Sequence, residues 1–420
     1  MSIGILSLIL LILAIIIGFF CKTNVGLISL CFALILSKIA GISAVTVLKG
    51  FNPNLFITLM GVSLLFSILN NNGTIKLLAQ KIVSLAGKNN YLIPIAIYLI
   101  GLLLTTIGPG SLPILAIMPA FAIPIAKAHG YNPLMLSMIG CAGCFSGRLS
   151  TITPEGILTY DYLLKYGIPS DVAVKPMYTA EVITGALLAI IIFLFYKGYK
   201  VDVPTEEQKE EVQEFNPKQI LSLMGLIVMA VLVIAFRYHV GLTCFAVSAI
   251  LITLHVGNEM ESMRSIPWGV LLMISGVSTL MGLVIDTGGI KILTHILSTI
   301  MNQRTAPAVM AATAGLMSLF SSALGVVFPT LFPTVGEIGQ SVGVSPLELM
   351  SMVFIGGTIT GYSPISTTGG LIIATMMSMK DSGYKGTQMD LFIELTVWAV
   401  AILVLLTIVA LTGFYGLIFR

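Results

Sequence analysis

The sequence predicts an all-α polytopic membrane protein built from two related halves, and three observations support this fold class. The first is composition: of 420 residues, 57% are apolar and 9% are charged, with a mean hydropathy of +1.03, whereas soluble domains carry about 25% charged residues. The second is a series of apolar stretches of roughly 17–25 residues, each long enough to cross about 30 Å of hydrocarbon. The third is a set of short motifs that recur at a nearly constant distance. Since backbone polar groups must be satisfied inside lipid, we expect these stretches to be helices and not the strands of an outer-membrane barrel.

The evidence for a repeat is seven short matches that lie at nearly the same offset. Any one of these matches alone would carry no weight. Four matches share the offset 215: Ile5-Leu6-Ser7-Leu8 with Ile220-Leu221-Ser222-Leu223, Val25-Gly26-Leu27 with Val240-Gly241-Leu242, Gly61-Val62-Ser63 with Gly276-Val277-Ser278, and Gly73-x-Ile75-Lys76 with Gly288-x-Ile290-Lys291. Three more are Gly130-x-x-Pro133-Leu134 with Gly343-x-x-Pro346-Leu347 at 213, and Gly147 and Gly156 with Gly361 and Gly370 at 214. We therefore predict a first repeat over 1–199 and a second over 218–420. The linker 200–217 carries a run of glutamates, which is typical of a solvated segment.

Within each half the pattern predicts five crossing helices and one hairpin, about 10 transmembrane helices in all. The expected crossings of the first half are Ile3–Phe20, Val25–Ile39, Leu55–Leu69, a broken span from Pro133 to Leu164, and Met177–Tyr196. We interpret the first of these as a retained span, not a signal peptide, and expect the amphipathic segment Thr74–Ala86 to lie in the interface plane.

The interrupted segment at about 91–128 is either two spans or one re-entrant hairpin. Its Gly108-Pro109-Gly110 break favours the hairpin, with the tip buried in protein. The second half repeats the pattern, with a hairpin at about 305–342 and its tip near Ser321–Gly325. An odd number of crossings per half predicts an inverted repeat, as in many secondary transporters. The excess of Lys and Arg on one side predicts a cytoplasmic linker and two extracytoplasmic termini in a bacterial inner membrane.

Four breaks rich in Gly, Ser and Thr are the candidate binding regions, because the ends of broken helices offer N–H groups to anions and carbonyls to cations. They are Thr105–Ser111, Gly147–Gly156, Ser321–Gly325 and Gly361–Gly370. The predicted substrate-binding residues are Gly110, Ser111, Arg148, Ser150, Thr151, Thr153, Ser363, Ser366, Thr367 and Thr368. The predicted cation-binding residues are Thr106, Gly108, Glu155, Ser322, Gly325 and Gly369.

Arg148 is the most informative single residue, because ionisable side chains inside membranes are costly and usually functional. Its guanidinium suits a carboxylate held by two parallel hydrogen bonds; the alternatives are an ion pair with Glu155, or a shallower position from which it snorkels. Glu155 itself suits a coupling proton or a cation, and the core offers little beyond it for a cation/proton antiporter. Cys141 and Cys144 form a CxxC, but without a second CxxC or a histidine partner they predict close helix packing.

Nothing in the sequence indicates an enzyme, an ATP-driven pump, a resident metal or a nucleic-acid partner, since no HExxH, Walker loop or nucleophile elbow is present. A passive channel is disfavoured because no ring of like charges accompanies the hairpin tips.

The segment Phe51-Asn52-Pro53-Asn54-Leu55-Phe56, running on to Asn70-Asn71-Asn72-Gly73-Thr74, resembles the N-terminal signature of MatC-type dicarboxylate carriers. Gly361–Gly370 resembles the same family's second-half motif. The resemblance places the chain in the ion transporter superfamily, beside the divalent-anion/sodium symporters. It implies a homodimer with scaffold and transport domains that moves malonate or another dicarboxylate by an elevator-type motion, usually with Na⁺ or H⁺. Where those symporters have Ser-Asn-Thr at each hairpin tip, this chain has Pro109-Gly110-Ser111 and Ala323-Leu324-Gly325, which moves the expected chemistry to the broken helices.

The leading hypothesis is therefore import of a small di- or tricarboxylate coupled to Na⁺ or H⁺, with no other cofactor. The alternative is a cation/proton antiporter or an inorganic-anion exporter on the same architecture.

Overall fold

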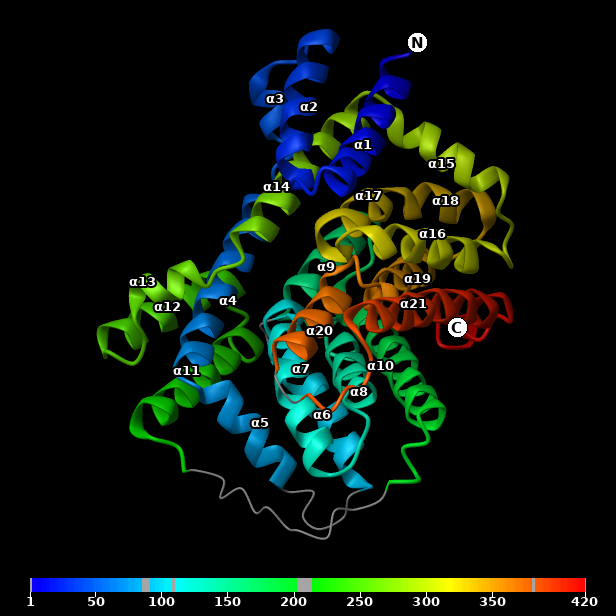
Figure 1. Cartoon of the computed structure of the whole chain (residues 1–420). Helices are drawn as coiled ribbons and strands as arrows, with labels where there is room; N and C mark the ends of the chain where they lie inside the picture. The colour runs from blue at the N-terminus through cyan, green and yellow to red at the C-terminus, as the bar shows by residue number, and fades with distance from the viewer. Residues whose placement is uncertain (1, 85–90, 108–109, 202–213, 380–381, 420) are drawn as a thin grey trace.

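The computed structural model describes residues 2–84, 91–107, 110–201, 214–379 and 382–419, and every regular element among them is a helix (Figure 1). The first half contains α1 (Ile3–Phe20), α2 (Val25–Ala40), α3 (Ala44–Leu48), α4 (Pro53–Asn71), α5 (Thr74–Ser84), α6 (Leu92–Thr106), α7 (Ser111–Ala128), α8 (Pro133–Ser146), α9 (Pro154–Lys165) and α10 (Ser170–Phe195). The all-helical class is confirmed over the described residues. Most of the glutamates of the predicted linker fall in 202–213 and Gly108 in the first hairpin tip, both outside the described residues.

The second half begins with α11 and ends near the C-terminus with α21. Its α-helices are α11 (Pro217–Ile234), α12 (Val240–Thr253), α13 (Glu259–Arg264), α14 (Trp268–Asp286), α15 (Gly289–Thr299), α16 (Ala306–Phe320), α17 (Phe328–Leu331), α18 (Val335–Val342), α19 (Pro346–Ile359), α20 (Thr367–Ser378) and α21 (Gln388–Leu411). Short π and 3-10 turns, η1 (Ala323–Val327) and η2 (Phe332–Thr334), break the second arm of the predicted hairpin at 305–342 into pieces.

Local sequence explains where the helices start. Asn132 accepts hydrogen bonds from the first backbone N–H groups of α8, with Pro133 at the first helical position. Ser345 and Pro346, at the repeat offset of 213, do the same for α19. A polar cap followed by proline is a strong helix start, because the cap satisfies an orphan N–H and proline has none to lose.

Left-handed backbone positions also recur at the repeat offsets. Lys22 and Arg237, which are related by the offset of 215, have φ of 52° and 55°, and Gly73 and Gly288 have φ of 77° and 79°. Gly130 and Gly343, which end α7 and α18, share φ of 73° at an offset of 213. Because such backbone is costly for residues with a Cβ, its recurrence at these offsets shows that the two halves turn in the same way.

Two helix crossings join the halves at glycines. A Cβ on Gly276 of α14 would collide with the backbone of Gly26 on α2, and one on Gly26 would collide with Leu272. A Cβ on Gly61 of α4 would likewise meet Gly241 on α12. Gly26 of α2 corresponds to Gly241 of α12, and Gly61 of α4 corresponds to Gly276 of α14, each by the offset of 215. The α2–α14 and α4–α12 crossings are therefore equivalent contacts in which the two halves have exchanged roles. Small residues allow this close approach of membrane helices.

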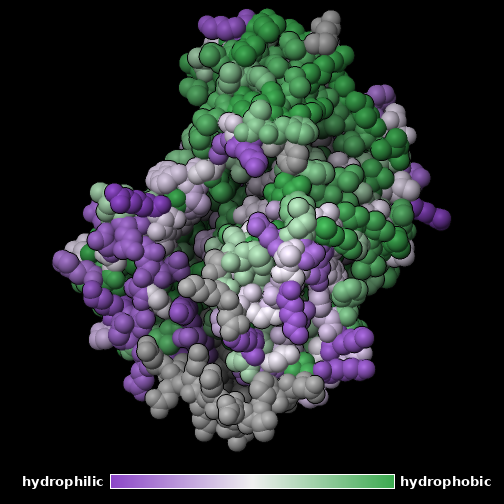
Figure 2. Space-filling model, in the orientation of Figure 1, coloured by the Kyte–Doolittle hydropathy of each residue, from purple (hydrophilic) through white to green (hydrophobic). Residues whose placement is uncertain are grey.

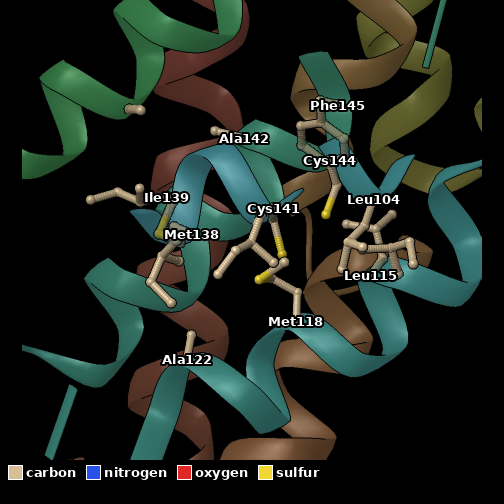
Figure 3. Packing of buried hydrophobic residues seen from close by; sticks show 14 of the residues in the cluster. Leu104, Leu115, Met118, Ala122, Met138, Ile139, Cys141, Ala142, Cys144 and Phe145 are labelled. Atoms are coloured by element: carbon tan, nitrogen blue, oxygen red, sulfur yellow. The ribbon is translucent and has the colours of Figure 1, made fainter. Parts of the chain in front are cut away.

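The remaining helices form a second group, α6–α10 with α16–α21, in which α6 packs on α8 and α16 on α19. Here too the close contacts match, since a Cβ on Gly143 would collide with the Tyr98 carbonyl and one on Gly356 with the Ala311 carbonyl. The described residues of α5 and α15 lie between the two groups, in contact with both. In Figure 3 the buried side chains of Met118, Cys141 and Cys144 point into one cluster between α6, α7 and α8.

The surface fits a membrane environment. Among the described helices, four are long and apolar enough to cross a membrane (α7, α10, α14 and α21), and eight shorter apolar helices of 10–17 residues accompany them. Large apolar side chains are exposed along α1, α2, α10 and α21. Figure 2 shows hydrophobic residues covering the end formed by α1–α3, with hydrophilic residues gathered over α11–α13. These are the features of a multi-pass membrane protein.

Candidate functional site

The first break separates α8 from α9 and is held by a side chain that was predicted to bind substrate. The hydroxyl of Thr153 lies within hydrogen-bond distance of the carbonyls of Arg148 and Ser150 and donates to either of them, and it accepts from the N–H of Gly156 at 3.1 Å. Thr153 is fully buried and acts as the N-cap of α9. Its hydrogen bonds therefore keep the break open and start the next helix, which is a structural task.

The second break, between α19 and α20, is built the same way. The Ser366 hydroxyl donates to the Gly361 carbonyl, as Thr153 does to Arg148. A Cβ on Gly369 would collide with the Ser363 carbonyl, as one on Gly156 would with that of Ser150. These matches lie at an offset of 213, one residue less than the alignment of Gly147 and Gly156 gives. Gly361 therefore occupies the place of Arg148, so the guanidinium is present in one break only.

Arg148 and Glu155 face each other across the first break, and the hairpin tip reaches them. Arg148 Nε lies 3.5 Å from Glu155 Oε1. The same oxygen accepts from the Ser111 hydroxyl at 2.7 Å and from the Ser111 N–H at 3.1 Å. Gly110, with φ of 70°, lets the chain pass so close that a Cβ there would lie 2.6 Å from Glu155 Oε2. The structure thus brings together four predicted site residues and forms the ion pair that was the alternative role for Arg148.

This cluster is buried but incompletely hydrogen-bonded. Arg148 is 6% exposed and Glu155 1%. Among the described residues, Arg148 Nε and Glu155 Oε2 have no hydrogen-bond partner, and the 3.5 Å contact is too long to count as one. The guanidinium also lies over the ring of Phe145, 5.1 Å from its centroid. Because buried polar atoms are normally paired, an open donor and an open acceptor side by side are typical of a site that binds something polar.

A narrow pocket with a cavity volume of about 20 Å³, room for about one water molecule, adjoins the carboxylate of Glu155 and collects residues from both halves. It is lined by Leu59, Ser63, Leu112, Pro113, Pro154, Glu155, Pro267, Val270, Leu271 and Leu324. The first hairpin tip, the first break, the second hairpin tip and the crossing helices α4 and α14 all contribute to it. Residues of both halves therefore come together at the first break, which is the one predicted break with charged residues, Arg148 and Glu155.

The second break contributes no residue to the lining of this pocket, and Phe145 contacts both breaks. Arg148 of the first break lies over the Phe145 ring, and the Tyr362 ring of the second break is in edge contact with it at 5.2 Å. Ser363 donates to the carbonyl of Leu319 in α16 at 2.7 Å. The hydroxyls of Ser363 and Ser366 are thus bonded to buried backbone carbonyls and not directed into the pocket.

The other predicted residues are distributed as follows. Thr106 bonds to its own helix and to the hydroxyl of Tyr178 at 2.6 Å. Ser322 accepts from the N–H of Gly325 at 3.2 Å and so caps η1. Thr151 and Thr367 are exposed, Ser150 is half-buried, and Thr368 is buried.

One buried carboxyl was missed. Glu181 of α10 is 1% exposed, and its Oε1 lies 2.9 Å from the hydroxyl of Thr358 in α19. The expectation that the core offers little beyond Glu155 is therefore wrong. The signal was present in the sequence, since a lone glutamate inside an apolar span is a functional candidate by default.

The CxxC packs as predicted. Cys141 and Cys144 are free, fully buried thiols in α8. Within the described parts of the chain, no group of three or more His, Cys, Asp or Glu side chains is placed to hold a metal ion.

Removing the Ser111 hydroxyl tests this geometry. Ser111→Ala deletes a hydrogen bond to a buried carboxylate, an interaction that contributes about 1.5–3 kcal/mol, so we expect lower thermal stability of the purified protein in detergent. Ser341→Ala is the matched control, because Ser341 is exposed and its hydroxyl, among the described residues, bonds to Ile338 of its own helix alone. Equal melting temperatures for both variants would contradict the buried contact.

Comparison with known proteins is consistent with the resemblance seen in the sequence. Residues 1–148 match the family model described as the N-terminus of the dicarboxylate carrier protein MatC. The MatC-type resemblance is confirmed over that segment. No curated protein matches the sequence significantly.

Two solved transporters share the fold. The YdaH transporter of Alcanivorax borkumensis superimposes with a TM-score of 0.59 at 10% identity, covering 88% of this chain and 87% of that one. MtrF of Neisseria gonorrhoeae, described within a class of antimetabolite efflux pumps, gives a TM-score of 0.52 at 17% identity, covering 87% and 82%. At these identities the likeness concerns the fold alone.

Proposed function

We propose that the chain is a secondary active transporter of a small di- or tricarboxylate, and that the carboxylate binds at Arg148 and the N-terminus of α7. The observation that carries this proposal is the buried guanidinium with an open N–H, beside a pocket formed by both halves. The MatC match over 1–148 supports the substrate class. Coupling is to Na⁺ or H⁺, and transport is inward across a bacterial inner membrane, with both termini outside.

In this proposal Glu155 is the internal competitor of the substrate. Its carboxylate now accepts the hydrogen bonds of Ser111 and pairs with Arg148. An incoming carboxylate takes those donors, and Glu155 is released by protonation or by binding the coupling cation. A helix N-terminus together with an arginine is a favourable anion site.

The motion we propose is an elevator-type movement of α6–α10 and α16–α21 against α1–α4 and α11–α14. It is supported by the pocket lying between these groups and by the exchange-symmetric contacts α2–α14 and α4–α12, which fit an inverted repeat. By the resemblance, the working unit is a homodimer.

Glu181 and the likeness to MtrF favour a second candidate. A buried carboxyl away from the pocket is what a cation/proton antiporter needs, and MtrF is described as an efflux protein. In this alternative the chain exchanges protons for a cation or exports an anion.

Uptake into proteoliposomes decides between the two. With radiolabelled malonate, succinate and citrate, applied with and without a Na⁺ gradient or ΔpH, we expect at least one carboxylate to accumulate under one gradient. Failure of every carboxylate under both gradients, while the protein collapses an imposed ΔpH when Na⁺ or K⁺ is added, would establish the antiporter instead.

A further inference from the structure

Glu181 lies near the middle of the longest helix among those described. It is the twelfth of the 26 residues of α10, about 17 Å from one end and about 21 Å from the other at 1.5 Å per residue. A carboxylate that is 1% exposed in an apolar helix is costly unless it is paired or neutral. The burial of the Glu181 side chain therefore has to be explained by the groups around it or by its protonation state.

The hydrogen bonds of Glu181 fit two protonation states equally well. The Thr358 hydroxyl lies 2.9 Å from Glu181 Oε1 and 3.0 Å from the carbonyl of Ile355 in its own helix. A hydroxyl has one proton, so it donates to only one of these oxygens at a time. When Glu181 is charged, Thr358 donates to it. When Glu181 is neutral, its own O–H donates to Thr358, whose proton turns to Ile355.

The second oxygen, Oε2, is buried and has no hydrogen-bond partner among the described residues. A carboxylate fixed permanently in the charged state would normally have both oxygens satisfied. Glu394 of α21 differs from Glu181 in this respect, since both of its oxygens accept hydrogen bonds, from the hydroxyls of Tyr196 at 2.5 Å and Tyr384 at 3.0 Å.

The charged and titratable groups around Glu181 come from several elements. Arg148, Tyr98 of α6 and Tyr415 beyond α21 interact with it electrostatically. From α8 come the thiols Cys141 and Cys144, which act on Arg148. The helix α9 adds Glu155, paired with Arg148, and α19 presents the hydroxyl of Thr358. Arg148 is thus the one cation of this set, shared by two carboxyl groups.

We propose that Glu181 binds and releases the proton that drives transport. Its carboxylate takes a proton from water on one side of the membrane, and the resulting carboxylic acid gives it up to water on the other side. Arg148, Glu155 and Glu181 together carry a charge of +1 −1 −1 = −1. Protonation of Glu181 brings this to zero, and the proton or cation that releases Glu155 brings it to +1. A dicarboxylate then returns it to −1, so both positive charges and both substrate carboxylates enter the low-dielectric core at constant charge, which is a physical basis for coupling.

The inference rests on the proposed function for its coupling role, and Glu181→Gln tests it. Glutamine keeps the size and the hydrogen bond to Thr358 but does not titrate. We expect substrate accumulation under ΔpH to fall at least tenfold, to the level seen without a gradient, while exchange of labelled for unlabelled substrate stays within about threefold of wild type. Glu394→Gln is the matched control and should keep ΔpH-driven accumulation.

Two results would overturn the proposal: accumulation under ΔpH by Glu181→Gln equal to wild type, or loss of exchange in a correctly folded variant. A substrate-free measurement separates failure of this inference from failure of the proposed function. Infrared titration of the purified protein should show a protonated-carboxyl band that changes with pH in wild type and is missing in Glu181→Gln. Identical bands in both proteins would count against Glu181 whatever the substrate is.

Discussion

Replacing Arg148 by lysine should raise the apparent KM for the transported carboxylate by about tenfold to a hundredfold. Lysine keeps the positive charge but loses the planar fork, which holds a carboxylate by two parallel bonds, and the face that lies over Phe145. Loss of one charge-assisted hydrogen bond costs about 1.5–3 kcal/mol, which corresponds to this range. The measurement is initial uptake rate against substrate concentration in proteoliposomes.

Arg264→Lys serves as the control for this variant, because Arg264 is exposed at the end of the short helix α13. It should leave both KM and maximal rate unchanged. If Arg148→Lys kept the wild-type KM and lost only thermal stability, Arg148 would have a structural role as the partner of Glu155, and the carboxylate site would lie elsewhere.

Valine at Gly276 should destabilise the protein by at least about 3 kcal/mol, at the upper end of overpacking effects. Any Cβ at this position meets the backbone of Gly26, which has no flexible side chain to move aside. The helices α2 and α14 must then separate, and the apolar cluster that they share with α1 opens. Thermal unfolding in detergent and the yield of monodisperse protein report the loss.

The matched variant is Gly269→Val on the same helix, where a Cβ meets nothing nearer than 3.8 Å. It should behave almost as wild type. Gly61→Val, the repeat equivalent of Gly276→Val, should reproduce the large effect at the α4–α12 crossing. Similar melting of the Gly269 and Gly276 variants would show that the close crossing is not needed for stability.

Apolar length and turn residues alone predicted most helix positions. The span Ile3–Phe20 agrees at both ends with α1, and Val25–Ile39 differs from α2 by one residue. The prediction failed at α10, which begins at Ser170 and not at Met177. The predicted span leaves out Lys175 and Pro176, whereas α10 continues through both and carries Pro176 inside the helix as its seventh residue.

The candidate site was predicted less well, because its geometry depends on contacts between distant residues. The breaks themselves follow from Gly, Pro and polar residues inside apolar spans. Thr153 and Ser366 bond within their own breaks, whereas Ser111 meets Glu155, 44 residues further along the chain. That last contact depends on how the start of α7 packs against α9. The sequence shows that a Ser or Thr is present but not which group its hydroxyl bonds to. Residues that cap a helix therefore could not be distinguished from residues that bind a ligand.

The glycine crossings also determine when, during translation, the helices of the first half can reach their final packing. Gly26 must wait for Gly276, which is 276 − 26 = 250 residues later, or about 12–50 s at about 5–20 residues per second. Until then α2 and α4 lie in the bilayer without the second-half helices α14 and α12, which pack on their glycines. The newly made first half is therefore an unfinished intermediate that the second half completes, so a ribosome stalled in the linker should leave a fragment that membrane proteases remove.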